Sequence, residues 1–551
     1  MKNFSAATLQ RLVAVFCAST LFFAAAVAQA QQRTRTTHVP VAVASGVAPR
    51  VGNLPGEQRL SLAISLPLRN QAELNELLQQ LYDPQSPNFH HYLSVAEFTS
   101  RFAPTASDYA AALDFARANG LAIIDAPANR LVVDVEGSAA SIEKAFNITL
   151  GLYQHPTESR TFYAPDREPS LDLATPVLHI SGLDNFTLPR AKNIRLAAAA
   201  SHIGKAGSGP GGQYVASDMR AAYYGSGPLT GSGQSVGLFE YAGYEISDVK
   251  TYFTNLGQTP KMNVRGVSLN GVSLDCPPAY CDDSEQAIDI EMAIGMAPNL
   301  KEVIVYVGNS DVSIFNQMAA DNTAKQLSCS WGWTDDESSL DPIFMEMAMQ
   351  GQSVFVASGD NGSGTPGDVV WPADDPFITS VGGTDVDTVS RGGPWKSETG
   401  WNGSAGSPSK NKIPIPSYQQ TPGVITPLNN GSTTLRNYPD VAAEANTNQY
   451  SCYDGYCSQG NGGTSFAAPQ WASFIAMANE RAVAGGGTTL GFLNPTLYTL
   501  GLGSTYDDDF HDITSGSNGA YSAVTGYDLV TGWGSPRGVD LINALLASDQ
   551  E

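Results

Sequence analysis

The strongest constraint on the fold is an alternation of apolar segments in the middle of the chain. Segments typical of buried β-strands occupy residues 235–241, 300–307, 326–331 and 353–357, and helical patterns between them occupy residues 284–296, 311–324 and 338–350. Strands that alternate with helices predict a parallel sheet with helices on its faces. Because ligands of such sheets bind at the carboxyl ends of the strands, the sequence predicts an α/β domain with its site at that edge.

A smaller α+β unit is predicted before this domain. Residues 59–66 and 131–135 alternate apolar and polar side chains, which indicates strands. Three capping patterns predict helix starts at Asn70 with Glu73, Ser94 with Glu97, and Thr105 with Asp108.

An Ala- and Gly-rich segment, residues 191–213, separates the two units. Its composition cannot hold a core, so it is predicted to be an exposed processing linker. The chain thus divides into an N-terminal unit (31–190), the linker (191–213) and a C-terminal domain (214–551).

Residues 1–30 have the pattern of a secretory signal peptide. Lys2 and Arg11 precede an apolar run, residues 12–27, and Ala28-Gln29-Ala30 has the small-x-small form of a cleavage site. The alternative is an uncleaved anchor, but the run is shorter than the about 20 residues of a spanning helix. The sequence therefore predicts a secreted protein that has no membrane association after cleavage.

The charge balance limits the possible partners. A formal net charge of −23 disfavours binding to nucleic acid or anionic membranes, which are also negative. Carboxylates protonate in acid, so self-repulsion falls there. The composition therefore agrees with activity in an acidic environment but does not require it.

The cysteines suggest two short disulfides. Of the six cysteines, Cys17 lies in the signal segment. Cys276 with Cys281 and Cys452 with Cys457 form close pairs in polar loops of an exported chain, and Cys329 is left as a buried thiol. Zinc binding is disfavoured because the spacing is poor and no histidines lie nearby.

Ser465 is the candidate nucleophile. Glycines 462 and 463 precede it and a helical stretch, residues 470–480, follows it. A hydroxyl at a helix N-terminus lies where amides and the helix dipole favour negative charge. The alternative is a plain N-cap serine.

No histidine is well placed to serve as its base. Of the seven histidines, only His202 and His511 lie beyond the start of the linker; His202 is near the processing site and His511 lies among aspartates. Where the aspartate of subtilisin follows the first core strand, this chain has Glu240.

Carboxylates are available instead. Glu285 and Asp289 are four residues apart in a predicted helix, so they share a face, and apolar neighbours favour their burial. Burial beside a like charge raises one pKa and promotes proton sharing. Asp360 follows a buried strand in a glycine turn. The alternatives are a solvated acidic face and an ordinary turn aspartate.

Together these segments resemble the sedolisin family of serine-carboxyl peptidases, and specifically its kumamolisin-like members with an activation prosegment. The matching segments are Leu81-Tyr82-Asp83-Pro84, Phe89-His90-His91-Tyr92-Leu93, 98–103, 214–223, 284–291, Ser330-Trp331-Gly332, Ser358-Gly359-Asp360 and Gly463-Thr464-Ser465. The resemblance implies a subtilisin-like parallel sheet flanked by helices. A ferredoxin-like α+β prodomain would precede it, assist folding and inhibit the site intramolecularly.

The resemblance also implies residue roles. Glu285 is the base, Asp289 its supporting acid, Asp360 the oxyanion residue and Ser465 the nucleophile. A glutamate, with a reference pKa of about 4.3, can accept a proton where histidine is already protonated, and Asp360 can donate a hydrogen bond only while protonated. The expected function is a secreted, monomeric, acid-active serine endopeptidase that processes its own zymogen and cuts proteins or peptides. Acid is expected to loosen the prodomain by protonating carboxylates at the contact.

A C-terminal segment resembles the calcium loop of the family. The implied ligands of one structural Ca²⁺ are the carboxylates of Asp512 and Asp528 and the carbonyls of Ile513, Val524 and Gly526. Hard oxygen ligands suit calcium, and water would complete the shell. Val524 departs from relatives that have glycine, but a carbonyl ligand depends mainly on backbone shape. The alternative is an acidic, Gly-rich surface loop.

Three rival functions remain. A histidine-dependent subtilisin lacks its histidine here, and a pepsin-like enzyme would need paired Asp-Thr-Gly or Asp-Ser-Gly motifs, which are absent. An inactive calcium-bound binding protein would show no cleavage at any pH.

Overall fold

The computed structural model describes residues 38–195, 207–333, 339–363 and 371–547. The predicted signal peptide and His202 lie outside the described residues. Its largest sheet has eight strands in the order β11-β12-β10-β13-β15-β16-β17, with β20 paired to β16. These pairs are parallel except β16 with β17, so the predicted parallel sheet is confirmed. The strands are β10 (Ser235–Glu240), β11 (Val264–Ser268), β12 (Glu302–Val307), β13 (Gln326–Cys329), β15 (Ser353–Ala357), β16 (Thr379–Thr388), β17 (Trp395–Gly400) and β20 (Val441–Glu444).

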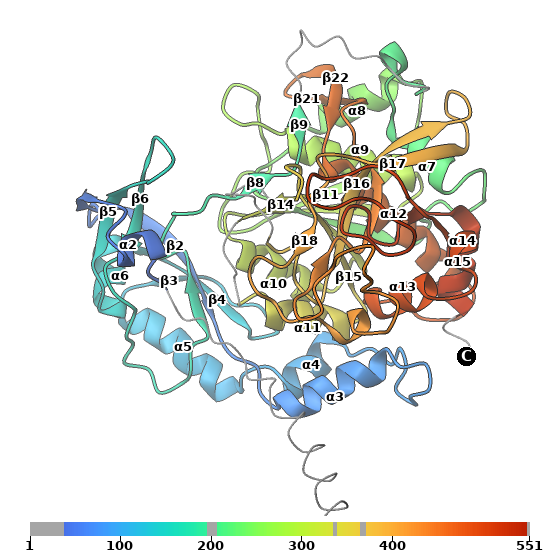
Figure 1. The fold of residues 1–551 in the computed structure, drawn as a ribbon. Helices are drawn as coiled ribbons and strands as arrows, with labels where there is room; N and C mark the ends of the chain where they lie inside the picture. The colour runs from blue at the N-terminus through green and yellow to red at the C-terminus, as the bar shows by residue number, and fades with distance from the viewer. Residues whose placement is uncertain (1–37, 196–206, 334–338, 364–370, 548–551) are drawn as a thin grey trace, which may run out of the picture. The chain divides into compact units, whose positions relative to one another are not determined.

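Helices pack on both faces of this sheet (Figure 1). Alternate residues of a strand point to opposite faces, and β15 shows this directly: Phe355 and Ala357 enter one apolar core, while Val354 and Val356 enter another. α9 and α12 contribute to the first core, and α10 and α11 to the second. The helices are α7 (Ala216–Tyr223), α8 (Ile246–Asn255), α9 (Ser284–Met296), α10 (Asp311–Asp321), α11 (Asp341–Met349), α12 (Thr464–Ala484), α13 (Asn494–Gly501), α14 (Tyr506–Asp509) and α15 (Gly538–Ala547).

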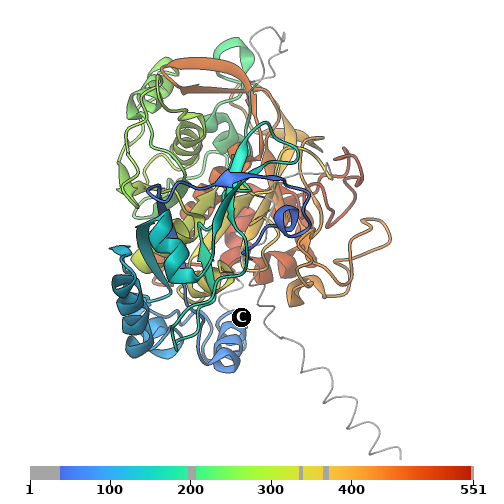
Figure 2. The same cartoon turned by 90° about the vertical axis from the view of Figure 1, so that its left-hand side faces the viewer.

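The N-terminal unit is an antiparallel sheet with helices, drawn in blue to cyan in Figure 2. Its four strands have the order β3-β4-β2-β7, which is the strand order of a ferredoxin-like unit. A second sheet has the order β1-β5-β6. The elements are α2 (Val41–Ala44), β1 (Arg50–Asn53), β2 (Arg59–Ser65), α3 (Gln71–Leu81), α4 (Val95–Arg101), α5 (Ala106–Ala118), β3 (Ala122–Asp125), β4 (Val132–Ser138), α6 (Ala139–Phe146), β5 (Leu150–Gln154), β6 (Thr161–Pro165) and β7 (His179–Ser181).

Two of the three predicted helix caps are correct. Ser94 forms a complete capping box with Glu97, and Thr105 caps α5. Asn70 precedes α3 but adopts a left-handed conformation and makes no side-chain cap. Its amide donates to the carbonyl of Arg101 at 2.9 Å instead, because a tertiary partner competes with the local one.

The N-terminal unit shares buried contacts with the C-terminal domain. Ser313 Oγ donates to Asp134 at 2.5 Å, and Asn129 Nδ2 donates to Glu346 at 2.8 Å. Burial raises the pKa of Asp134 to about 7 and that of Glu346 to about 8. A raised carboxyl pKa stabilises the folded chain at low pH, and this contribution is lost as the pH rises from the ordinary carboxyl range toward 7 or 8. The expectation that acid loosens the prodomain stays a prediction.

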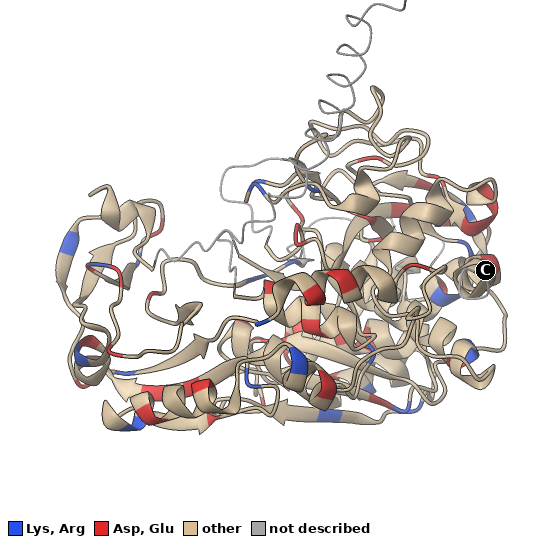
Figure 3. Ribbon diagram, turned by 90° about the horizontal axis from the view of Figure 1, so that it is seen from below, with Lys and Arg blue, Asp and Glu red and all other residues tan. Residues whose placement is uncertain are grey.

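Both predicted disulfides, Cys276–Cys281 and Cys452–Cys457, are present, and Cys329 is a buried free thiol. The second disulfide joins β21 (Gln449–Tyr453) to β22 (Tyr456–Gly462). Red acidic segments predominate over blue basic ones in Figure 3, in agreement with the net charge of −23. None of the helices in the described ranges is long and apolar enough to cross a membrane.

Candidate active site

Ser465 lies in the first turn of α12 and is fully buried. Gly463 precedes the helix, and Ser465 forms no side-chain cap, so the interpretation as a plain N-cap serine is excluded. The Ser465 amide donates to the carbonyl of Lys192 at 3.0 Å, and its hydroxyl lies 3.4 Å from the carbonyl of Ser330. The hydroxyl therefore lies at a helix N-terminus, and the amide of the same residue binds a backbone carbonyl of the predicted linker.

Glu285 and Asp289 lie on α9 and are 1% and 0% exposed, so a solvated acidic face is excluded. Asn193 Nδ2 donates to Glu285, and Ser330 Oγ donates to Asp289 at 2.8 Å. Burial raises the pKa of Glu285 well above its usual range, and Asp289 adds to this. Hydrogen bonds from Ser465 and Asn193 oppose the rise in the pKa of Glu285.

Glu240 is a third buried carboxyl group of this cluster, and its role was missed in the sequence. It ends β10, accepts from Trp331 Nε1 at 2.9 Å and lies close enough to Asp289 for each group to affect the other's pKa. Burial raises the pKa values of both carboxyl groups well above their usual ranges. Two buried carboxyl groups that interact in this way favour sharing of one proton. The rule that singled out Asp360, a carboxylate at a strand end, also applies to Glu240.

Asp360 follows β15 and lies beside the N-terminus of α12. Its Oδ1 accepts from the Thr464 amide at 2.7 Å and hydroxyl at 2.9 Å. Its Oδ2 has no hydrogen-bond partner among the described residues. Burial raises the pKa of Asp360 to about 7. The protonated group therefore has a donor available below neutral pH.

Gly463 leaves room for this donor. Its φ of 123° is a conformation that favours glycine. A Cβ there would lie 2.5 Å from the carbonyl oxygen of Lys192 and 2.7 Å from Asp360 Oδ2. Gly463 thus lies close to both Asp360 Oδ2 and the Lys192 carbonyl, which the Ser465 amide also contacts. A protonated Asp360 and a backbone amide are the kinds of donor that an oxyanion hole uses.

The start of the predicted linker is bound in this site as extended chain. β8 (Arg190–Ala191) pairs antiparallel with β14 (Trp331–Gly332), and β9 (Ile194–Arg195) pairs antiparallel with β22. Lys192 is 2% exposed. The expectation of an exposed linker is therefore wrong here: backbone pairing to strand edges orders a segment that carries few apolar side chains.

His511 is not available as a base for this serine. Its ring stacks on Trp395 at 3.9 Å, and burial lowers its pKa to about 3. The carboxyl group whose pKa is lowered by a hydrogen bond from Ser465 is Glu285.

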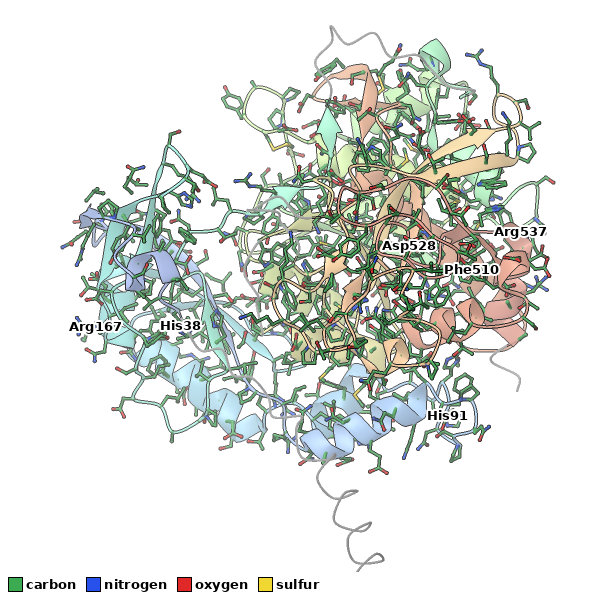
Figure 4. All side chains as sticks on the ribbon, viewed as in Figure 1. His38, His91, Arg167, Phe510, Asp528 and Arg537 are labelled. Carbon is green, nitrogen blue, oxygen red and sulfur yellow. A yellow bond between two sulfur atoms is a disulfide. The ribbon has the colours of Figure 1, made fainter. Side chains whose placement is uncertain are left out.

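The residues of the expected calcium loop lie together near the C-terminus, where Figure 4 labels Asp528. Asp512 accepts from the Gly526 amide at 3.2 Å, and Asp528 accepts from the Val524 amide at 3.0 Å. Two carboxylates thus lie against one short backbone segment. Carboxylate and carbonyl oxygens are the ligands that Ca²⁺ prefers, so the donor set fits the ion.

Comparisons with known proteins agree with this site. Residues 48–186 match the family model "Pro-kumamolisin, activation domain", and residues 280–489 match "Subtilase family". Kumamolisin from Bacillus sp. (strain MN-32) is 30% identical over 531 residues, which cover 90% of this chain and 93% of that protein. Sedolisin from Pseudomonas sp. (strain 101) is 28% identical over 546 residues, 91% of this chain and 90% of that protein.

A solved structure of Pseudomonas sedolisin, a serine-carboxyl proteinase complexed with two molecules of pseudo-iodotyrostatin, has a TM-score of 0.52 and 25% identity. The match covers 61% of this chain and 99% of that one. The chain therefore belongs to the sedolisin family of serine-carboxyl peptidases and carries the activation prosegment of its kumamolisin-like members.

Proposed function

We propose that this serine peptidase is a secreted, acid-active endopeptidase that matures by cutting itself, with Ser465 as the nucleophile and carboxyl groups as its proton carriers. One observation carries the proposal. The Lys192 carbonyl accepts a hydrogen bond from the Ser465 amide, next to Asp360, while the next residue, Asn193, contacts Glu285. The linker thus resembles a bound substrate.

Proton transfer follows from the contacts of Glu285. The ionised group accepts the proton of Ser465 as the hydroxyl attacks, and later returns it to the leaving amine. Asp289 and Glu240 interact with each other and with Glu285, so a proton shared between them can offset the charge change on Glu285. Histidine would be fully protonated in the same acidic medium.

The bound linker also supports internal cutting. Its chain pairs with β14 before Lys192 and with β22 after Asn193. A substrate that continues on both sides of the cut bond is therefore accommodated.

Asp360 is the proposed acid-dependent donor to the oxyanion. Asp360→Ala should lower kcat by about 10²- to 10³-fold, the usual loss for one such donor. Asp360→Asn should keep the contacts to Thr464 and present an N–H in place of Oδ2. Because the pKa of Asp360 is about 7, the donor of the native protein is lost above that pH. The asparagine variant should therefore lose the decline in rate near pH 7, as measured by pH–rate profiles. An alanine variant with native rates would contradict the donor role.

We also propose one structural calcium ion, held by Asp512, Asp528 and the carbonyls of Ile513, Val524 and Gly526. Bound calcium at 100 times its Kd should stabilise the fold by about 2.7 kcal/mol. Chelation should therefore lower the Tm, and Asp528→Asn should abolish the response to added calcium in calorimetry. Asp387→Asn, a change in β16 outside this loop, is the control. A Tm that stays the same whether calcium is added or removed would rule out the site.

A further inference from the structure

The backbone of Lys192 is held on both sides of its Cα. Its amide donates to the carbonyl of Ser330 at 2.9 Å, and its carbonyl accepts from the Ser465 amide at 3.0 Å. The peptide bond between Lys192 and Asn193 therefore lies at the nucleophile. In this arrangement Lys192 is the residue before the cut bond, and its side chain occupies the first specificity pocket.

That pocket holds the whole lysine side chain. Lys192 Nζ donates to the carbonyl of Ala357 at 2.6 Å, at the end of β15. A Cβ on Gly332 would overlap both Lys192 Cε and Nζ, so the glycine leaves the space that the aliphatic stem fills. A long unbranched side chain fits this space, and its tip meets a backbone acceptor.

Carboxyl groups near the pocket attract the buried ammonium. Asp360 attracts Lys192 more strongly than Asp374, which is fully buried and accepts from Ser409 Oγ at 2.7 Å, and burial raises the pKa of Asp374. Burial lowers the pKa of Lys192 to about 8, so the ammonium stays charged in acid. A buried ammonium needs such partners, and an uncharged side chain leaves them unused.

We infer that the peptidase cuts its own chain between Lys192 and Asn193 and selects lysine before the cut bond in its substrates, with Gly332 and the carbonyl of Ala357 forming the selective pocket. This inference rests on the proposed function and names its substrate class. The bound linker is then both the inhibitor and the first substrate.

The chemistry balances as an ordinary acyl transfer. Ser465 Oγ bonds to the carbonyl carbon of Lys192, the bond to the Asn193 nitrogen breaks, and Glu285 carries the serine proton to that nitrogen. Water then attacks the acyl group, which releases the Lys192 carboxylate and restores the serine hydroxyl.

The first test is self-processing of the full chain. Purified precursor is incubated at about pH 4, near the carboxylate reference values, and sampled by mass spectrometry. The earliest cut should leave Lys192 as a new C-terminus and Asn193 as a new N-terminus. Lys192→Gln should slow this cut by about 10- to 100-fold, the range that hydrogen bonds to a charged group are worth. Lys144→Gln, the same charge change on an exposed site of α6, should process at the native rate.

The second test uses the mature enzyme and three peptides that differ only before the cut bond, with lysine, methionine or glutamate. Methionine has a long, unbranched side chain without a charge, so it separates the effect of length from the effect of charge. Lysine should exceed methionine by about 10- to 100-fold in kcat/KM, and glutamate should be slowest. Gly332→Ala should reduce the lysine to methionine ratio by blocking the pocket.

The outcomes separate the inference from the proposed function. Equal cleavage of the three peptides, or a first cut elsewhere with Lys192→Gln unaffected, would overturn the lysine preference while leaving an active peptidase. No cleavage of any peptide at any pH would overturn the proposed function itself. If Gly332→Ala fails to fold, the comparison of the three peptides with the native enzyme still tests the lysine preference.

Discussion

Ser465→Ala should leave the full-length precursor uncut in acid and lower peptide turnover by about 10⁴- to 10⁶-fold. The hydroxyl is the group from which the acyl-enzyme forms, and alanine removes it while the Ser465 backbone amide can still hold the Lys192 carbonyl. The variant should therefore fold and keep its linker bound. The measurement is gel and mass-spectrometric analysis of the precursor over time, with rates on a peptide substrate.

Ser473→Ala is the matched control for this change. Ser473 is also fully buried in α12, but it lies two turns beyond the site. It should process and turn over substrate at close to native rates. If Ser465→Ala retained native activity, the nucleophile would be another group, as in a pepsin-like mechanism.

Glu285→Gln should lower kcat by about 10²- to 10⁴-fold, the range for loss of one general base. The amide cannot take the proton of Ser465. Its carbonyl oxygen can still accept from Asn193, so the linker contact is preserved. Substrate binding should change little, and the loss should appear in kcat more than in KM.

Glu302→Gln provides the control for Glu285→Gln. Glu302 lies on β12 and pairs with Arg265 away from the site, so the same change there should leave kcat near the native value. A Glu285→Gln enzyme that turned over at the native rate would show that the proton goes elsewhere.

The parts of the fold that could be predicted from sequence are those that depend on the spacing of apolar and charged residues within one segment. The apolar runs gave β10, β12, β13 and β15, and the helical pattern over 284–296 matches α9. The four-residue spacing brought Glu285 and Asp289 onto one face. Both inferences depend only on local periodicity, which the chain carries within each segment.

The start of α12 could not be placed in this way. The sequence indicated a helix from residue 470, but α12 begins at Thr464 and contains Pro469. Proline lacks an N–H and usually marks a boundary within a helical pattern, so it shifted the expected start. Tertiary contacts, including the Asp360 bonds to Thr464, stabilise the earlier turn.

The bound linker could not be predicted for a different reason. Composition describes side chains, whereas Arg190–Ala191 and Ile194–Arg195 are held by backbone pairing with distant strand edges. The third carboxyl group, Glu240, likewise became significant only when burial and the contact with Asp289 were known. Long-range pairing and shared protons are properties of the folded chain.

The central claim is that carboxyl groups replace histidine, and the pH dependence of kcat/KM on a single peptide tests it most directly. Glu285 must be ionised to accept a proton, whereas Asp360 must be protonated to donate, and the pKa of Asp360 is about 7. The rate should therefore rise as Glu285 ionises, pass through a maximum and fall as Asp360 ionises near pH 7. A rate that still rises above that pH would contradict the mechanism.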